Sequence, residues 1–301
     1  MLPLKFGRRF IRKTAFRDVV NYGSVTFLIL LAARLRFRTD AMVVGTFLSA
    51  AAITYFSVGS KFVDYANDIV QALAQIFTPM SSHFHSKGEF DKLRKIFIAG
   101  NRACALTMFP ISVALILLGK SAISVWVGPK YVSSYIVLLI LVIPSTLYSA
   151  QATSTKILFG MSKHRSLGMI VVLEGLANLI LSIYLVRRMG IVGDALGTAI
   201  PLLCTSIFFL PRHLCRLLNV PVATFLRQAY LLPAALCVPL VLTLWLMQHW
   251  FFARTYPQLI FQLAAGGIVY AAGLLWVFVT REPDGIRLRA RFMERMHAAG
   301  R

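Results

Sequence analysis

Long apolar blocks separated by short polar segments run through the whole sequence. The clearest blocks cover residues 135–148, 168–186, 230–252 and 259–280. A helix of about 20 apolar residues is long enough to cross the hydrocarbon core of a bilayer. The pattern therefore predicts an all-α integral membrane protein with about eight transmembrane helices. We place these spans at residues 20–40, 44–80, 97–118, 132–155, 167–186, 191–211, 230–250 and 259–280.

The composition agrees with a membrane protein and argues against a soluble one. Only 14% of the residues are charged and 58% are hydrophobic, whereas soluble domains carry about 25% charged residues. The net charge of +21 could indicate nucleic-acid binding. The basic residues lie between the apolar blocks, however, and do not form one face, so we expect no nucleic-acid partner. The four cysteines show no metal or redox spacing, and we expect no cofactor and no metal.

The distribution of cations sets the number and direction of the spans. A break in the middle of the long second span would give two spans, 41–60 and 62–80, and nine in total. Both ends of the chain are basic, and basic segments prefer the cytoplasm, so an even number is favoured. With eight spans, 22 of the 32 lysines and arginines lie on the cytoplasmic side and eight on the outer side. We therefore expect a multi-pass protein of a bacterial inner membrane with both termini in the cytoplasm.

The pattern divides the chain into four regions. The first alternates apolar side chains with cations, as expected for a basic amphipathic helix on the cytoplasmic membrane surface. The last two spans contain no charged residue in their apolar stretches and are expected to face lipid, with Gly267 and Ala271 as a weak packing signal. The regions are the amphipathic helix, a six-helix transporter lobe, two additional transmembrane helices and a basic cytoplasmic tail, at residues 1–19, 20–216, 217–281 and 282–301.

A polar stripe runs along the second span. Its members recur at steps of three and four and share one helix face: Thr54, Ser57, Lys61, Asp64, Asp68, Gln71 and Gln75. A charged side chain at mid-bilayer costs about 2.5–3.5 kcal/mol on insertion scales, so the stripe is expected to face protein or a water-filled cavity. Internal neutralisation of Lys61 by Asp64 is the alternative, but it leaves Asp68 and Gln71 unexplained. These four residues are candidate substrate-binding residues.

Two further pairs are candidates for the same cavity. Arg34 and Arg38 share one face at the end of the first span. They either snorkel to the outer surface or present guanidinium groups to a phosphate inside the vestibule. Glu174 and Asn178 lie four residues apart in the fifth span and also share a face. They either form an interhelical hydrogen bond or line the cavity.

Three other charged residues are expected at the ends of spans. Asp40 belongs to the charged segment that ends the first span, and Asp194 lies near the outer end of the sixth span, where it could cap the helix. Arg102 is placed about one turn into the third span, from which it can snorkel inward.

No known catalytic motif is present in the sequence. It contains no nucleophile-elbow sequence, no Walker loop and no His-Glu-x-x-His zinc motif. We therefore expect a protein that is not an enzyme. Any transport would use an ion gradient or run downhill.

Several ordered segments resemble one family. Residues 16–23 resemble the linker that opens the second lobe of polysaccharide flippases, and the "W-x-G-x-x-Y" of residues 126–131 matches an outer loop. The strongest match is Asn178 to Ser182 followed by Gly190 to Thr198, which is similar to "N-x-x-x-x … G-I-x-G-x-A-x-x-T" and departs from it at Asp194. The other matching segments are residues 40–48, 77–82 and 87–89. Together they resemble the O-antigen and capsule (Wzx-like) branch of the multidrug/oligosaccharidyl-lipid/polysaccharide exporter superfamily.

The resemblance implies a fold, a substrate and partners. Members usually have two six-helix lobes around a central cavity, and this chain resembles the C-terminal lobe with two extra helices. The implied substrate is a polyprenyl-pyrophosphate-linked oligosaccharide, flipped within membrane lipids for cell-surface polysaccharide biosynthesis while the lobes rock about the cavity. One lobe would act with a second copy or a separately encoded N-terminal lobe.

Two other functions stay open on the sequence alone. The first is a cation-coupled drug exporter of the same superfamily, in which carboxylates such as Asp64, Asp68 and Glu174 carry protons or sodium. The second is a non-transporting membrane subunit or fragment.

Overall fold

The computed structural model describes residues 39–281 together with residues 17, 20, 23, 24 and 27. The predicted helix at 1–19, most of the first span, and the tail at 282–301 lie outside the described residues. A helical segment at 39–47 comes first. The elements after it are α2 (Ala50–Ala74), α3 (Phe77–Ser86), α4 (Phe90–Trp126), the 3₁₀ helix η2 (Pro129–Ser134), α5 (Tyr135–Ser149), α6 (Ala152–Gly160), α7 (His164–Met189), α8 (Ile191–Cys204), the π-helical η3 (Thr205–Phe209), α9 (Leu210–Leu217), α10 (Val222–Trp250) and α11 (Tyr256–Arg281).

The described part of the chain is an all-α membrane protein, as predicted. Six of its helical stretches are long and apolar enough to cross a bilayer, and they lie within residues 90–126, 129–149, 167–189, 191–217, 222–250 and 256–280. Helix α2 has 25 residues, a comparable length, but it carries three charged side chains near its centre. Its mean hydropathy alone would therefore not identify it as a span.

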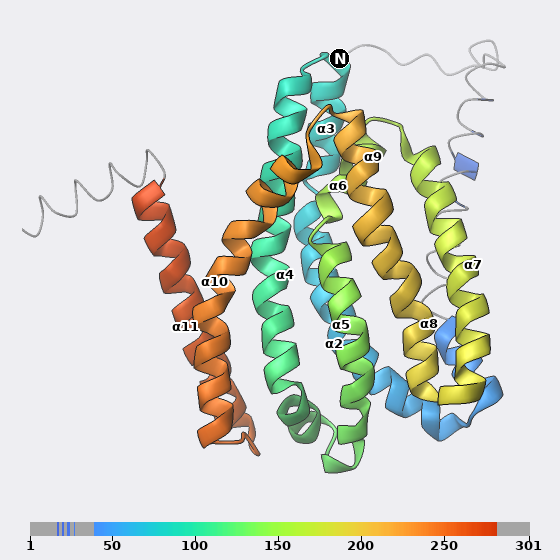
Figure 1. The fold of residues 1–301 in the computed structure, drawn as a ribbon, viewed down its shortest axis with the longest axis vertical. Coiled ribbons are helices and arrows are strands. Elements are labelled where there is room, and N and C mark those ends of the chain that lie inside the picture. Colours follow the sequence, from blue (N-terminus) through green and yellow to red (C-terminus); the bar gives the residue numbers. More distant parts are fainter. Residues whose placement is uncertain (1–16, 18–19, 21–22, 25–26, 28–38, 282–301) are drawn as a thin grey trace, which may run out of the picture.

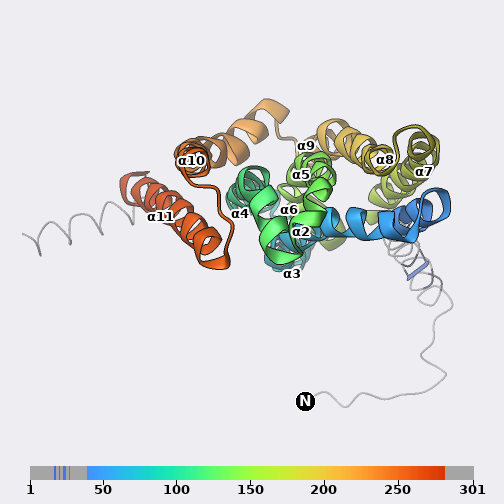
Figure 2. The ribbon, with the colours of Figure 1, turned by 90° about the horizontal axis from the view of Figure 1, so that it is seen from below.

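The helices run up and down between two ends of the bundle (Figure 1). The turns that follow α3, α6 and α9 lie at one end, and those that follow α4, α7 and α10 lie at the other. Seen along the helices, the bundle is a flattened layer with α7 and α8 at one edge and α11 at the other (Figure 2). The alternation agrees with the predicted assignment of these loops to opposite membrane faces.

The boundary between the first two predicted spans needs correction. Residues 39–47 are helical, and α2 begins only at Ala50, six residues after its predicted start. Ser49 caps α2, because its hydroxyl oxygen accepts a hydrogen bond from the amide of Ala52 at 3.2 Å. Helix α2 is continuous to Ala74, so the alternative split near residue 61 is wrong. The predicted second span also breaks before α3.

The apolar face of α2 packs into the bundle. Val63, Ala66, Val70 and Ala74 are buried on this face, and the last three form a cluster with side chains of α4 and α6. Polar pairs join the inner helices where small side chains allow a close approach. The hydrogen bonds are Asn101 to Ser154 at 3.0 Å, Ser149 to Asn67 at 2.7 Å, and between the hydroxyls of Ser112 and Thr146 at 2.6 Å.

Helices α7 and α8 form a hairpin whose backbones nearly touch. Gly190 ends α7 at φ +60°, a conformation that favours glycine. A Cβ atom at Gly193 would lie 2.2 Å from the Leu185 carbonyl oxygen, and one at Gly197 would lie 2.3 Å from the Ser182 hydroxyl oxygen. The two glycines thus form a small-xxx-small motif along α8 that brings the polar side chains of both helices together.

Helices α10 and α11 lie at the outside of the bundle, as predicted for lipid-facing additions. Only 6% of the apolar stretch of α11 is buried. The packing signal at Gly267 was wrong, because a Cβ there would meet nothing within 4 Å. Gly266 faces Leu240 and Leu244 of α10 instead, and it is the residue that lets the two helices approach.

Candidate functional site

The structure separates the predicted site residues into two groups. Lys61, Asp64, Asp68 and Gln71 share one face of α2. Glu174 and Asn178 are buried in α7, at the edge of the bundle. Arg34 and Arg38 lie outside the described residues, so their place in a cavity stays a prediction.

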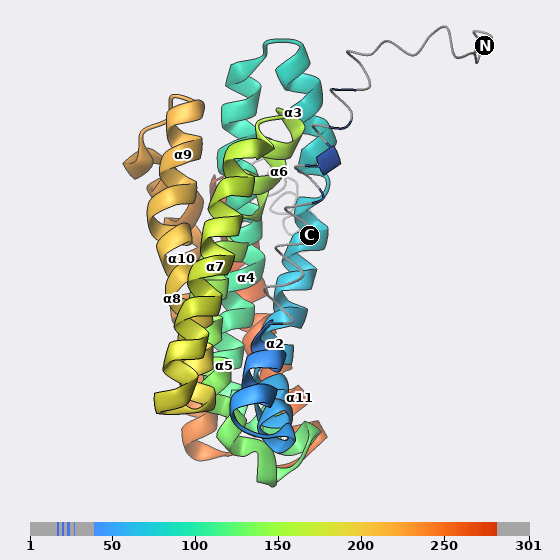
Figure 3. The same cartoon turned by 90° about the vertical axis from the view of Figure 1, so that its right-hand side faces the viewer.

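The polar row of α2, defined as Lys61, Asp64, Asp68 and Gln71, is not covered by the part of the chain that the structure describes. Lys61 and Asp68 are exposed, and Asp64 and Gln71 are half-buried. With a rise of about 1.5 Å per residue, the row covers about 15 Å around the middle of the helix. Exposed apolar side chains, among them Tyr65 and Ile69, lie beside it. In Figure 3, α2 occupies one edge of the bundle, with α8 and α10 toward the other.

Lys61 and Asp64 form an ion pair within this row. The ammonium nitrogen lies 3.4 Å from a carboxylate oxygen, and the side chains are 53% and 34% exposed. Internal neutralisation of these two residues is therefore real. It does not extend to Asp68, which has no ion pair among the described residues. A carboxylate and an amide beside the pair thus remain available to a polar ligand.

A second polar site, the buried network, joins three helical segments. Asp40 accepts a hydrogen bond from the Thr198 hydroxyl at 3.0 Å, and the Asn178 amide donates to the same hydroxyl oxygen at 2.8 Å. The three side chains are between 2% and 9% exposed. Of the two expectations for Asn178, the interhelical hydrogen bond is therefore confirmed.

Two more carboxyl groups belong to the buried network. Glu174 lies one turn from Asn178 on α7 and is 5% exposed. Asp194 on α8 is fully buried, and no described residue donates a hydrogen bond to its carboxylate oxygens. It lies close enough to Asp40 for their charges to repel each other. The hydroxyl of Ser182 points at the backbone carbonyl of Asp194 from 3.4 Å.

Sequence analysis missed Asp40, Asp194 and Thr198 as site residues. It placed Asp40 at the end of a span, but the helix continues to residue 47 and carries Asp40 inside the bundle. It placed Asp194 as a helix cap, but Gly190 occupies the N-cap position of α8. The available signal was spacing, since residues 174, 178 and 182 and residues 194 and 198 recur at steps of four.

The buried network can hold a proton or a monovalent cation. A buried carboxylate is costly when charged and unpaired, so it takes up a proton or a cation to become neutral. Oxygen atoms of carboxylates, amides and hydroxyls are the ligands of hard cations. The described residues contain no group of three or more His, Cys, Asp and Glu side chains that could hold a metal ion.

Two comparisons by sequence find similar proteins. Residues 4–136 match the family model for polysaccharide biosynthesis proteins. The chain is also 21% identical over 193 residues to a Haloferax volcanii protein named probable low-salt glycan biosynthesis flippase Agl15. That alignment covers 63% of this chain and 41% of the relative, so the chain spans less than half the length of this relative.

A comparison by structure finds the same fold. The lipid II flippase MurJ, in an inward closed conformation, superposes with a TM-score of 0.67 at 16% identity. The match covers 89% of this chain and 56% of MurJ, and it shows the fold alone. Over residues 4–136 the chain is thus similar to polysaccharide biosynthesis proteins, and over most of its length it shares the fold of a lipid flippase.

Proposed function

We propose that the chain flips a lipid-linked oligosaccharide across the membrane for cell-surface polysaccharide biosynthesis. The observation that carries this proposal is the polar row of α2, which holds two acids, a lysine and an amide on one face of a 25-residue helix packed among helices apolar enough to cross a membrane. Side chains of this kind would be costly against lipid tails, so they require a watery or protein environment. Relatives named as flippases supply the substrate class.

The polar row would line one wall of the transport chamber. A second lobe, on the same or another polypeptide, would supply the opposite wall, since MurJ and the Haloferax volcanii protein are both much longer than the matched region. Sugar hydroxyls would bind Asp64, Asp68 and Gln71. The pyrophosphate would lie near cations, for which Lys61 and the two arginines of the first span, Arg34 and Arg38, are the candidates. The polyprenyl tail would stay in the bilayer.

The buried network would couple transport to an ion gradient. Asp40, on one helical segment, and Asn178 and Thr198, on the α7–α8 hairpin, belong to elements that can shift relative to each other. Proton or cation uptake would neutralise the buried carboxylates and favour the packed arrangement. Release would favour separation of the segments, which links ion binding to the rocking of the lobes.

We place the protein in a bacterial inner membrane, with both termini in the cytoplasm. The cations support this orientation, because Lys92, Arg94 and Arg216 lie near the turns at one end of the bundle, together with most other cations of the loops.

The test replaces the host's own gene by variants, so that every natural partner is present. Lipid-linked oligosaccharide protected from a membrane-impermeant periodate reagent is measured in spheroplasts, together with surface polysaccharide. We expect gene deletion, and the double variant Lys61→Gln with Asp64→Asn, to accumulate protected oligosaccharide. A deletion strain with normal surface polysaccharide and no protected intermediate would contradict the proposed function.

The chain offers a matched control for this double variant. Lys92 and Glu89 also form an i,i+3 ion pair, at 3.0 Å, with side chains 57% and 34% exposed. This pair lies at a turn outside the apolar stretch of α4. Lys92→Gln with Glu89→Gln removes the same charges, and we expect normal surface polysaccharide. Equal defects in both double variants would remove the site assignment.

A further inference from the structure

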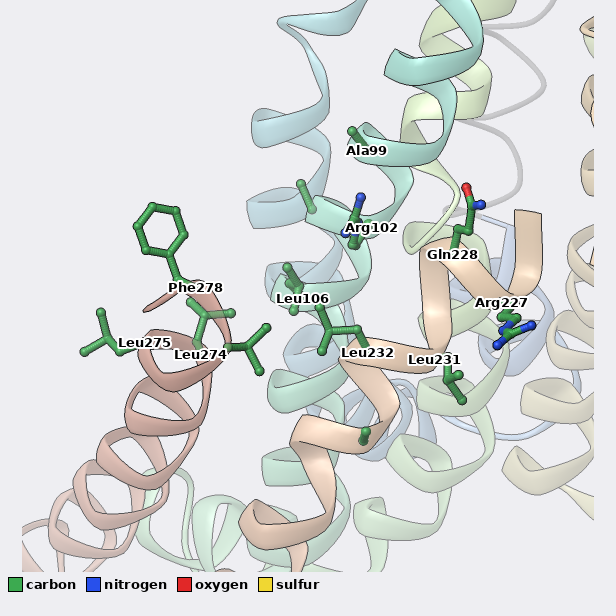
Figure 4. Close-up of a pocket in the computed structure, with 13 residues that line it drawn as sticks. Ala99, Arg102, Leu106, Arg227, Gln228, Leu231, Leu232, Leu274, Leu275 and Phe278 are labelled. Carbon is green, nitrogen blue, oxygen red and sulfur yellow. The ribbon is translucent and has the colours of Figure 1, made fainter. Parts of the chain in front are cut away.

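A large cavity lies between α4, α10 and α11, away from the polar row of α2. Its volume is about 1030 Å³, and its walls are mostly aliphatic and aromatic side chains. Figure 4 shows Leu106 of α4, Leu231 of α10, and Leu274 and Phe278 of α11 around it. The proposed flipping mechanism uses none of these residues, so the cavity calls for a separate explanation.

Among the described residues of the lining, two arginines and one amide are the only strongly polar side chains. They are Arg102 of α4, which is half-buried, and Arg227 and Gln228 at the start of α10. Among the described residues, none that lines the cavity is acidic, and neither arginine has an ion pair or a hydrogen bond. The cavity thus has a positive end and a long apolar wall, the charge pattern of a site for an anionic amphiphile.

The depth of the arginines places them at the boundary between headgroups and hydrocarbon. Helix α4 begins at Phe90 and not at residue 97, so Arg102 lies three turns inside it. From Arg102 to Trp126 the helix rises about 36 Å, and from Arg227 to Trp250 the rise along α10 is about 35 Å. A bilayer has about 30 Å of hydrocarbon with tryptophans at its edges. Helix α4 therefore puts Arg102 at one membrane interface and Trp126 at the other. Helix α10 bends at its prolines, and Arg227 near its start lies at a similar level to Arg102 (Figure 4).

Two aromatic residues of α11 indicate the same membrane depth, independently of the arginines. Tyr256 and Trp276 lie near its two ends and are both exposed, and they are separated by about 30 Å of helix. Trp276 lies within the segment that lines the cavity, between Leu274 and Phe278. An interfacial tryptophan at this position confirms that the lining of α11 is at headgroup depth.

We propose that this cavity binds one anionic phospholipid of the bilayer. Its phosphate would receive hydrogen bonds from the guanidinium of Arg102 and the amide of Gln228, and Arg227 would add a second positive charge at the mouth. One acyl chain would lie along Leu231, Leu274 and Phe278. Basic pockets between transmembrane helices at the cytoplasmic side are suited to such headgroups. The lipid would fill the space between α4 and the sparsely packed α11 and hold that helix against the bundle.

The experiment uses the full chain purified into nanodiscs that contain phosphatidylglycerol and phosphatidylethanolamine in equal amounts. Bound lipid is extracted after transfer to detergent and quantified by mass spectrometry. We expect the wild type to retain phosphatidylglycerol with about tenfold preference, and Arg102→Gln with Arg227→Gln to lose this preference. The control Arg212→Gln with Arg216→Gln removes two cations from α9, at the same end of the bundle, and should keep it.

A second measurement does not depend on the folding of a charge variant. A photoreactive phenylalanine analogue in place of Leu275, which lines the cavity, should crosslink to phosphatidylglycerol in an otherwise native chain. The proposal is overturned if the arginine variant keeps the preference and no crosslink forms. It is also overturned if an equimolar polyprenyl-pyrophosphate displaces the phospholipid, since the cavity would then belong to the route of the flipped substrate. Neither readout requires transport, so failure here is distinct from failure of the proposed function.

Discussion

The polar row of α2 and the buried network are made of similar residues at similar spacing, yet the protein uses them in opposite ways. The polar row lies on one helix, its one ion pair among the described residues is internal, and its side chains are exposed or half-buried. The buried network lies on three helical segments, and its hydrogen bonds join residues up to 158 positions apart. The first group is therefore available to a ligand, whereas the second holds the bundle together.

The difference also predicts two kinds of mutational effect. Removing a partner from a buried hydrogen bond leaves a desolvated polar atom and costs about 1–3 kcal/mol. Removing one member of an exposed ion pair costs about 0–1 kcal/mol. Substitutions in the buried network should thus lower stability, and substitutions in the polar row should lower transport while leaving stability nearly unchanged. The following predictions are ordered by their expected effect on the free energy of unfolding.

The largest effect is expected for Gly197→Leu. A Cβ atom at this position would meet the backbone of Ser182 at 2.6 Å, so α7 and α8 must separate. Overpacking costs about 1–3 kcal/mol or more, and the buried network would be pulled apart as well. The measurement is the yield of monodisperse protein and its thermal unfolding in detergent. Gly175→Leu on α7 is the control, because a Cβ at Gly175 has nothing within 4 Å; equal losses in the two variants would exclude the packing explanation.

A smaller effect is expected for Thr198→Val, which keeps the shape and removes the hydroxyl between Asn178 and Asp40. We expect a loss of about 1–3 kcal/mol in thermal unfolding experiments, together with loss of transport. The control is Thr243→Val on α10, whose exposed hydroxyl bonds only the Pro239 carbonyl of its own helix at 2.9 Å. If Thr198→Val unfolds like the wild type, the buried network does not hold the segments together.

Substitutions in the polar row should lower transport and leave stability nearly unchanged. Asp68→Asn removes a charge that has no ion pair among the described residues. We expect thermal unfolding to change by about 0.5 kcal/mol or less, while transport in the spheroplast assay falls. Asp91→Asn is the reference, because Asp91 is an exposed acid near the turn before α4. Normal transport by the Asp68→Asn variant would show that transport does not require the charge of Asp68.

Single cysteine substitutions are expected to change stability least. Their rates of labelling test the environment of α2 directly. Cys204 is exposed and must first be replaced by serine. In native membranes we expect cysteine at position 64 or 68 to react with a charged maleimide about tenfold faster than cysteine at position 70, since Val70 is fully buried. Cysteine at position 69 tests whether an exposed position beside the polar row faces water or lipid, because Ile69 is exposed there. Slow labelling at all of these positions would exclude a watery chamber.

The sequence was sufficient for features that depend on spacing within one helix. Steps of three and four placed the polar row on one face of α2 and Val63, Ala66 and Val70 on the other. The last two helices, whose apolar stretches at 230–250 and 259–280 carry no charge, were correctly expected at the outside of the bundle. Such patterns lie within one helix, so they can be recognised in a single sequence without an alignment.

The sequence was insufficient where function depends on contacts between distant segments. Asp40 and Thr198 meet because Gly193 and Gly197 let α8 approach α7 closely and because residues 39–47 are helical and carry Asp40 into the bundle. The end of that helix was misplaced because residues 41–58 are almost continuously apolar, and only Ser49 marks the break. Neither the close approach nor the extension can be recognised from the charge of Asp40 itself.

The polar row of α2, which the described part of the chain leaves uncovered, has a consequence for the fate of the protein in the cell. Three formal charges left against acyl chains would cost roughly 10 kcal/mol on insertion scales, which is comparable to the net stability of a whole domain. Under the proposed function, a molecule whose polar row is left uncovered would therefore insert poorly and be a natural target for membrane proteases. The cellular amount of this chain should follow the amount of its partner, even when its own synthesis is constant.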